Sequence, residues 1–134
     1  MIAVDTSVVV AGFASWHEAH TEARAALARQ PRIPAHVLIE SYSVLTRLPP
    51  PHRAPSPLVA EFLRARFPDP PLTLVGRAHV ALLQLAIEGG VRGGAMYDAL
   101  VGATAKHAGA TWLTRDRRAV AIYEVVGAAY ELVD

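Results

Sequence analysis

The stretch from Tyr97 to Ala105 constrains the fold most, because it is predicted to be a helix of almost only small or apolar residues with one acid near its start. Asp98, Val101 and Ala105 fall on one helical face, and Ala108 continues that face. Because the face is otherwise uncharged, we expect it to pack against the rest of the protein with the carboxylate pointing inward. An inward carboxylate is costly unless a cation or hydrogen-bond donors meet it. The sequence must therefore supply a partner for this carboxylate or bring a cation to it.

Short apolar runs alternate with helical segments along the chain, a pattern typical of α/β proteins. The expected strands are residues 1–4, 32–34, 72–75, 110–113 and 128–133. The expected helices are residues 8–14, 15–29, 35–48, 57–66, 76–88, 95–108 and 117–125. Two proline-rich loops, 49–57 and 67–71, separate some of these elements. This order predicts a three-layer sandwich with a central parallel sheet of four to five strands and helices on both faces.

The size and composition of the chain predict one packed domain over residues 1–134. Hydrophobic residues make up 52% and charged residues 19%, which argues for a core and against disorder. The net charge of +1 gives no global basic field, so any site for a polyanion must be local. The absence of cysteine excludes a disulfide framework, a thiolate zinc site and a cysteine nucleophile.

The start of the chain does not look like a targeting or membrane segment. It has no basic leader, and an acid already occurs at Asp5. The uncharged stretch from Thr6 to Trp16 is too short to cross a bilayer. We therefore expect a cytoplasmic, soluble protein with no membrane partner.

Four acids occupy places where a carboxylate is awkward. Asp5 and Asp116 directly follow predicted strands, and Glu40 and Asp98 lie on otherwise apolar helix faces. In open α/β sheets, ligands bind beyond the carboxyl ends of the strands, so these acids are expected to meet there. Gathered carboxylates would repel one another and hold protons unless hard divalent cations such as Mg²⁺ or Mn²⁺ joined them. Two such ions about 4 Å apart can activate water and clamp a phosphodiester, so the acids predict metal-dependent hydrolysis.

Each acid also has a structural alternative. Asp116 could be the N-cap of the helix that follows it, and Asp5 could form a local Asx-turn. Glu40 could be a buried acid paired with an arginine such as Arg47. Asp98 could simply favour the first turn of its helix through the helix dipole. All four alternatives would have to apply at once to replace the metal site.

At these residues the chain resembles PIN-domain ribonucleases, and specifically VapC-type toxins of bacterial toxin–antitoxin pairs. The segments that carry the resemblance occur in the family's order and span nearly the whole chain. They are residues 4–7 (Val-Asp-Thr-Ser), Glu40, residues 97–99 (Tyr-Asp-Ala) with 102–105 (Gly-Ala-Thr-Ala), and residues 113–116 (Leu-Thr-Arg-Asp). One departure is Ala119, where relatives often have an aromatic residue; we expect this to affect packing more than chemistry.

The resemblance implies a PIN-like fold and Mg²⁺ (or Mn²⁺) ligation by Asp5 and Asp98. Glu40 and Asp116 would complete the acidic cluster, directly or through water. The positions that line the site in the family correspond to Thr114 and to Thr6 or Ser7. Proteins of this family cleave RNA, are held inactive by a small antitoxin and commonly form homodimers.

Arginines surround the last acid. Arg115, Arg117 and Arg118 bracket Asp116 and could contact RNA phosphates beside the metals. The alternative is ordinary solvated charge on a helix.

A second apolar face lies near the N-terminus. Ser15 is expected to cap helix 15–29, which places Trp16, Ala19, Ala23 and Leu27 on one face. This face could belong to the core, or part of it could form a groove for an antitoxin helix.

Other functions compete with the nuclease. One is a non-catalytic interaction module on the same fold. A phosphoacceptor domain using Asp5 would need a lysine near the site, but the only lysine, Lys106, lies deep in the Asp98 helix. A haloacid-dehalogenase-like phosphatase would need Asp-x-Asp, and Ser7 occupies the second place.

Overall fold

The computed structural model describes residues 1–134, which form three strands and seven α-helices. The strands are β1 (Ile2–Val4), β2 (Thr111–Thr114) and β3 (Tyr130–Leu132). The helices are α1 (Thr6–Phe13), α2 (His20–Ala28), α3 (Ala35–Arg47), α4 (Ser56–Arg66), α5 (Gly76–Gly89), α6 (Ala95–His107) and α7 (Val120–Val126). A short 3₁₀ helix, η1 (Arg117–Ala119), precedes α7.

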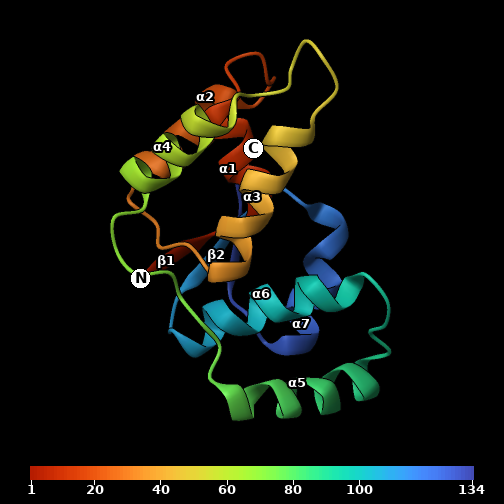
Figure 1. Cartoon of the computed structure of the whole chain (residues 1–134). Helices are drawn as coiled ribbons and strands as arrows, with labels where there is room; N and C mark the ends of the chain where they lie inside the picture. The colour runs from red at the N-terminus through yellow and green to blue at the C-terminus, as the bar shows by residue number, and fades with distance from the viewer.

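The strands form one parallel sheet in the order β1-β2-β3. Figure 1 shows helices α1 to α4 as one group and α5 to α7 as another, with the strands between the two groups. Helices from both groups contact β2, because α1 and α6 pack against it. This arrangement confirms the predicted α/β class with a parallel sheet flanked by helices.

The prediction of four to five strands is wrong for two of the segments. Residues 32–34 and 72–75 do not form strands. Arg32 makes a single parallel bridge to Ala3 of β1, and Leu72 makes a single parallel bridge to Pro34. Prolines explain this reduction, because a proline has no N–H to donate to the ladder. The chain has prolines at 31, 34, 70 and 71, so neither segment can extend its pairing.

The predicted start of the second helix is also wrong. Ser15 caps nothing, and α2 begins only at His20, after a turn in which the His17 Nδ1 accepts a hydrogen bond from the Ala19 backbone N–H at 3.0 Å. Trp16 therefore lies outside the helix and is 50% exposed. Its ring stacks on His52, with the ring centroids 4.0 Å apart. A turn that the His17 side chain stabilises therefore stands where the capping box predicted the first turn of the helix.

Ala23 and Leu27, which were predicted to lie on the same helix face as Trp16, are buried in the core. No helix in the structure combines the length and apolarity needed to cross a membrane.

Close packing of α6 on α7 fixes the position of the Asp98 helix. A Cβ at Gly102 would lie 3.0 Å from Val126 Cγ2 and 3.2 Å from Tyr123 Cδ1, so the missing side chain lets the two helices approach. Tyr123 is fully buried and packs edge-on against Trp112 of β2. Ala119, where relatives often have an aromatic residue, is buried one turn before it. The large ring in this part of the core is thus supplied from the next turn.

Candidate active site

The site begins where β1 and β2 end side by side. Val4 pairs with Leu113 across the sheet, and the backbone N–H of Asp5 donates to the Leu113 carbonyl at 2.9 Å. This register places Asp5 next to Thr114, the last residue of β2. Asp5 also occupies the N-cap position of α1, although its side chain caps nothing there. Its carboxylate is free to face the edge of the sheet instead.

Two hydroxyl groups hold the Asp5 carboxylate in place. Its Oδ2 accepts hydrogen bonds from Ser7 Oγ and from Thr114 Oγ1, both at 2.8 Å. Each hydroxyl in turn accepts a backbone N–H, from Arg115 to Ser7 at 2.9 Å and from Asp116 to Thr114 at 3.0 Å. The bond from Thr114 comes from a distant part of the chain, so Asp5 is oriented by the tertiary structure and not by a local Asx-turn alone.

The Asp5 carboxyl group is only 9% exposed. Burial raises its pKa above the ordinary value, because the charged form loses water. The hydrogen bonds from Ser7 and Thr114 act in the opposite direction, and the negative charge of Glu40 raises the pKa further. The two hydroxyls therefore favour the ionised form of Asp5 and oppose the effect of burial on its pKa.

Glu40 reaches the same edge from α3. Thr6 Oγ1 donates a hydrogen bond to its Oε1, which ties α3 to the first turn of α1. His36, one turn earlier on α3, places its Nε2 3.6 Å from Oε2 of Glu40. The alternative pairing of this acid with Arg47 is not formed, so its partners are a hydroxyl and an imidazole beside the site.

Asp98 lies in the first turn of α6 and is half-buried. Its pKa is raised to about 6, first by burial and then by the negative charges of Asp116, Asp5 and Glu40. No hydrogen bond opposes these effects. Carboxylates from three other parts of the chain therefore act electrostatically on the Asp98 side chain. The four acids that the sequence singled out therefore lie close enough for the charges of the other three to act on Asp98.

Asp116 combines two of the roles considered from sequence. Its Oδ1 accepts the backbone N–H of Arg118 at 3.0 Å, so it is the N-cap of η1. It is nevertheless half-exposed, and its charge contributes to the raised pKa of Asp98. Capping and membership of the acidic cluster are compatible here, because the cap uses one carboxylate oxygen.

The donor set of this edge fits a hard divalent cation. It consists of carboxylate and hydroxyl oxygens, and the mutual repulsion of the acids is relieved when a cation joins them. No group of three or more acids and histidines is already arranged around one point. A cation at this edge would thus be held by one or two carboxylates together with water, which is how proteins commonly bind Mg²⁺.

The burial of Asp98 and its repulsion by the other acids predict a pH-dependent loss of folding stability when divalent cations are removed. Because the folded-state pKa of Asp98 lies near 6, above its ordinary value of 3.8, stability falls as the pH rises from about 4 to about 6. After discounting for partial exposure, we expect Asp98→Asn to be more stable than the wild type by on the order of 1 kcal/mol at pH 7.5 in EDTA.

Urea unfolding followed by tryptophan fluorescence measures this difference. The gain should shrink as the pH falls through 6 and approach zero below about pH 3, where Asp98 is protonated in both the folded and the unfolded state. A variant that is less stable than the wild type at pH 7.5 would contradict the electrostatic account of the cluster.

The three arginines around Asp116 differ in their surroundings. Arg117 donates from one guanidinium nitrogen to both carboxylate oxygens of Asp134, at 2.8 and 2.7 Å. Arg115 is half-buried. The pKa of His17 is lowered first by the burial of its own ring and then by the positive charge of Arg115. Arg118 is exposed and makes no ion pair. Of the three, Arg118 is the best placed for an unhindered contact with a polyanion.

We therefore expect Arg118→Ala to weaken RNA binding and to reduce the slope of log K against log[salt] by about 1, whereas Arg117→Ala changes the slope less. Filter binding across a salt series measures both slopes. Equal slopes for wild type and Arg118→Ala would remove this arginine from the RNA-binding surface.

One residue of the site was not singled out from the sequence. His36 lies beside Glu40 and its ring stacks on Tyr97, the residue before Asp98. The available signal was its spacing, because residues four apart on a helix share a face.

Comparison with known proteins gives concordant results. A family model described as PIN domain matches residues 2–125. Ribonuclease VapC40 of Mycobacterium tuberculosis, in strains H37Rv and CDC 1551, is 52% identical over 133 residues, which cover 99% of this chain and 99% of that protein. Ribonuclease VapC27 of M. tuberculosis H37Rv is 40% identical over 127 residues, covering 94% of this chain and 92% of the relative.

Proposed function

Because this chain belongs to the PIN-domain family, as a VapC-type ribonuclease, we propose that it is a Mg²⁺- or Mn²⁺-dependent endoribonuclease and the toxin of a toxin–antitoxin pair. The whole chain, residues 1–134, would act as one nuclease domain in the cytoplasm. The observation that carries the proposal is the Asp5 carboxylate, which hydrogen bonds from Ser7 and Thr114 hold at the ends of the strands. The pKa of Asp98, which is raised first by burial and then by the charges of Asp116, Asp5 and Glu40, supports the same site.

The acids divide into two pairs in this proposal. Asp5 and Asp98 hold the cation, and Glu40 and Asp116 complete its surroundings directly or through water. When bound, the cation lowers the pKa of the attacking water and neutralises charge on the phosphodiester. No side-chain nucleophile is needed.

The hydroxyl groups act as positioning residues. Ser7 and Thr114 donate to Asp5 and favour its ionised form, which a divalent cation requires. Thr6 donates a hydrogen bond to Glu40 and so orients that carboxylate. Because these bonds link α1, α3 and β2, Asp5 and Glu40 keep their relative positions when the negatively charged substrate approaches.

The substrate is RNA, and its phosphates would be met locally by Arg115, Arg117 and Arg118. In-line attack by water on the phosphodiester leaves a 5′-phosphate and a 3′-hydroxyl. The 2′-hydroxyl of the RNA does not act as the nucleophile.

Incubation of the purified chain with total cellular RNA, with Mg²⁺ or with EDTA, tests the proposal when the cut ends are mapped. We expect cleavage only with the metal and only 5′-phosphate, 3′-hydroxyl ends. A 2′,3′-cyclic phosphate product would contradict the mechanism.

Partners are the second part of the proposal. Large apolar side chains are strongly exposed on α3 and α5, among them Ile39, Val80 and Ile87. Exposed apolar surface on a small protein supports binding of other chains. We infer a small antitoxin and a second copy of this chain as those partners. The face of α2 is a poor candidate for the antitoxin, because Ala23 and Leu27 lie in the core.

A further inference from the structure

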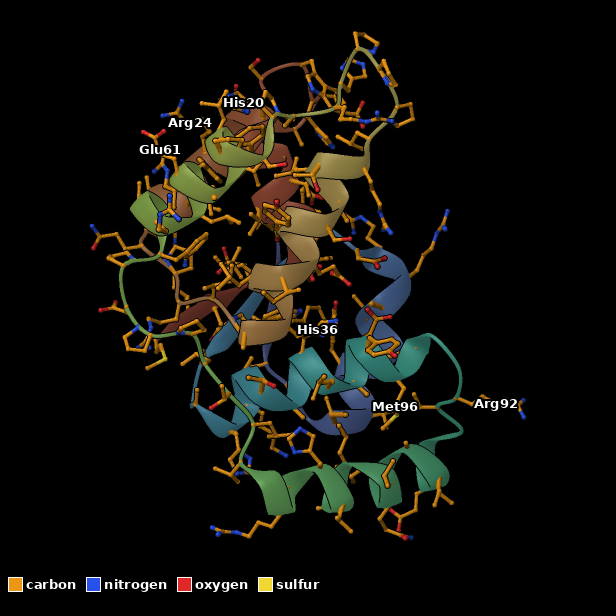
Figure 2. All side chains as sticks on the ribbon, in the orientation of Figure 1. His20, Arg24, His36, Glu61, Arg92 and Met96 are labelled. Atoms are coloured by element: carbon orange, nitrogen blue, oxygen red, sulfur yellow. The ribbon has the colours of Figure 1, made fainter.

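A stacked pair of rings adjoins the acidic cluster. The rings of His36 and Tyr97 lie with centroids 5.3 Å apart and an interplanar angle of 7°. They come from different helices, α3 and α6, and Figure 2 shows His36 in the space between these two helices. The tyrosine is 60% exposed, so its ring is not part of the core. The pair is a flat aromatic surface that two helices form together.

Each of the two rings lies next to one of the acids. Tyr97 directly precedes Asp98 on α6. His36 is one turn before Glu40 on α3, with Nε2 3.6 Å from Oε2 of that acid. Anything that places a phosphate at the acids must therefore have its neighbouring groups close to these rings.

We propose that the Tyr97 ring, supported from behind by His36, is the surface on which one unpaired base of the RNA stacks, beside the phosphodiester that is cut. This inference rests on the proposed ribonuclease function and adds the mode of substrate recognition to it. Proteins that recognise single-stranded RNA stack unstacked bases on aromatic side chains. A base paired inside a duplex offers no free face, so the surface selects single-stranded segments.

A protein partner is the competing occupant of this surface. An apolar hollow between α5 and α6, lined by Val80, Leu83, Met96, Tyr97 and Leu100, continues from the tyrosine. We favour RNA because the stacked pair adjoins the acids, where a substrate has to lie, whereas the hollow extends away along α5. The test below separates the two.

Binding of a fluorescein-labelled single-stranded RNA of about 12 nucleotides, measured by anisotropy in EDTA, gives the first readout. We expect Tyr97→Ala to weaken binding by about 5- to 100-fold, the range for loss of one base–aromatic stack. Tyr97→Phe keeps the ring and should bind like the wild type. Tyr42→Ala removes another exposed tyrosine, on α3, and is the matched control that should change nothing.

Abasic substitution provides the second readout. The same RNA is prepared with one base removed at each position in turn. In the wild type, removal of the stacked base should weaken binding by about as much as Tyr97→Ala does. In Tyr97→Ala, removal of that base should have no further effect, because the two changes delete the same contact.

The inference is overturned if Tyr97→Ala binds RNA like the wild type, or if every abasic RNA affects both proteins equally. It is also overturned if Tyr97→Ala changes only the oligomeric state seen by sedimentation, because that result assigns the surface to a protein partner. The readouts do not need cleavage. Loss of binding in Tyr97→Ala, together with no cleavage by the wild type in Mg²⁺, would refute the proposed function and leave the stacking surface in place.

Discussion

Asp98→Asn is expected to reduce the rate of RNA cleavage by about 10²- to 10³-fold, the range seen when one preorganised electrostatic group is removed from an active site. The amide has nearly the shape of the carboxylate but lacks the charge that would attract a divalent cation. Because Asp98 is half-buried and accepts no hydrogen bond from the protein, the substitution should leave the fold intact. Single-turnover cleavage of a labelled RNA in Mg²⁺ measures the effect.

Asp69→Asn is the matched control for this variant. Asp69 is an exposed acid in the loop before Leu72, with only a long contact of 3.9 Å to Arg32. Its substitution should leave the cleavage rate unchanged. If both variants cleaved RNA like the wild type, the acidic cluster would not be the active site, and the non-catalytic interaction module would become the better description of this fold.

Removal of divalent cations with EDTA is expected to lower the cleavage rate at least as much as Asp98→Asn, by about 10³-fold or more. The physical reason is that the acids offer oxygen ligands to a cation and that the site has no activated hydroxyl or thiol nucleophile: Ser7 and Thr114 both donate to Asp5, and the chain has no cysteine. Addition of Mg²⁺ or Mn²⁺ in excess of the chelator should restore the rate.

The control for this experiment is a measurement that the protein stays folded in EDTA. Circular dichroism in EDTA should match that in Mg²⁺, which shows that lost activity does not reflect unfolding. Cleavage that continued at the same rate in EDTA, with the same end groups, would exclude a metal-dependent mechanism.

Much of the site could be predicted from the sequence because its chemistry depends on strand ends and helix faces. Asp5 and Asp116 follow apolar strands, and parallel strands bring such positions to one edge. Asp98 and Glu40 were recognisable as acids on apolar faces. For each of these, local sequence and the final position agree, and the raised pKa of Asp98 reports their convergence.

The predictions that failed depended on interactions that local patterns do not contain. The bridges Ala3–Arg32 and Pro34–Leu72 remain single because prolines limit the ladder, although residues 32–34 and 72–75 have strand-like composition. The start of α2 was missed because the His17 side chain accepts the backbone N–H of Ala19 and closes a turn where the helix was expected to have begun. Helix boundaries of this kind depend on which polar side chain accepts a hydrogen bond from the backbone, and the local sequence pattern does not determine that.

The support around the acids was the least predictable part. The bond from Thr114 to Asp5 joins residues that are far apart in the chain, and its partners follow only from the register of β1 and β2. The stack of His36 on Tyr97 likewise depends on how α3 approaches α6. Helix spacing could place His36 beside Glu40, but it could not bring it to a ring on another helix.

Titration of Mn²⁺ into the wild-type protein and into Asp98→Asn at neutral pH, followed by electron paramagnetic resonance, tests the central claim most directly. It measures whether the converging acids bind a divalent cation, independently of any RNA. The account predicts saturable binding by the wild type and at least about tenfold weaker binding by the variant. Equal binding by the two proteins, or none by the wild type, would contradict it.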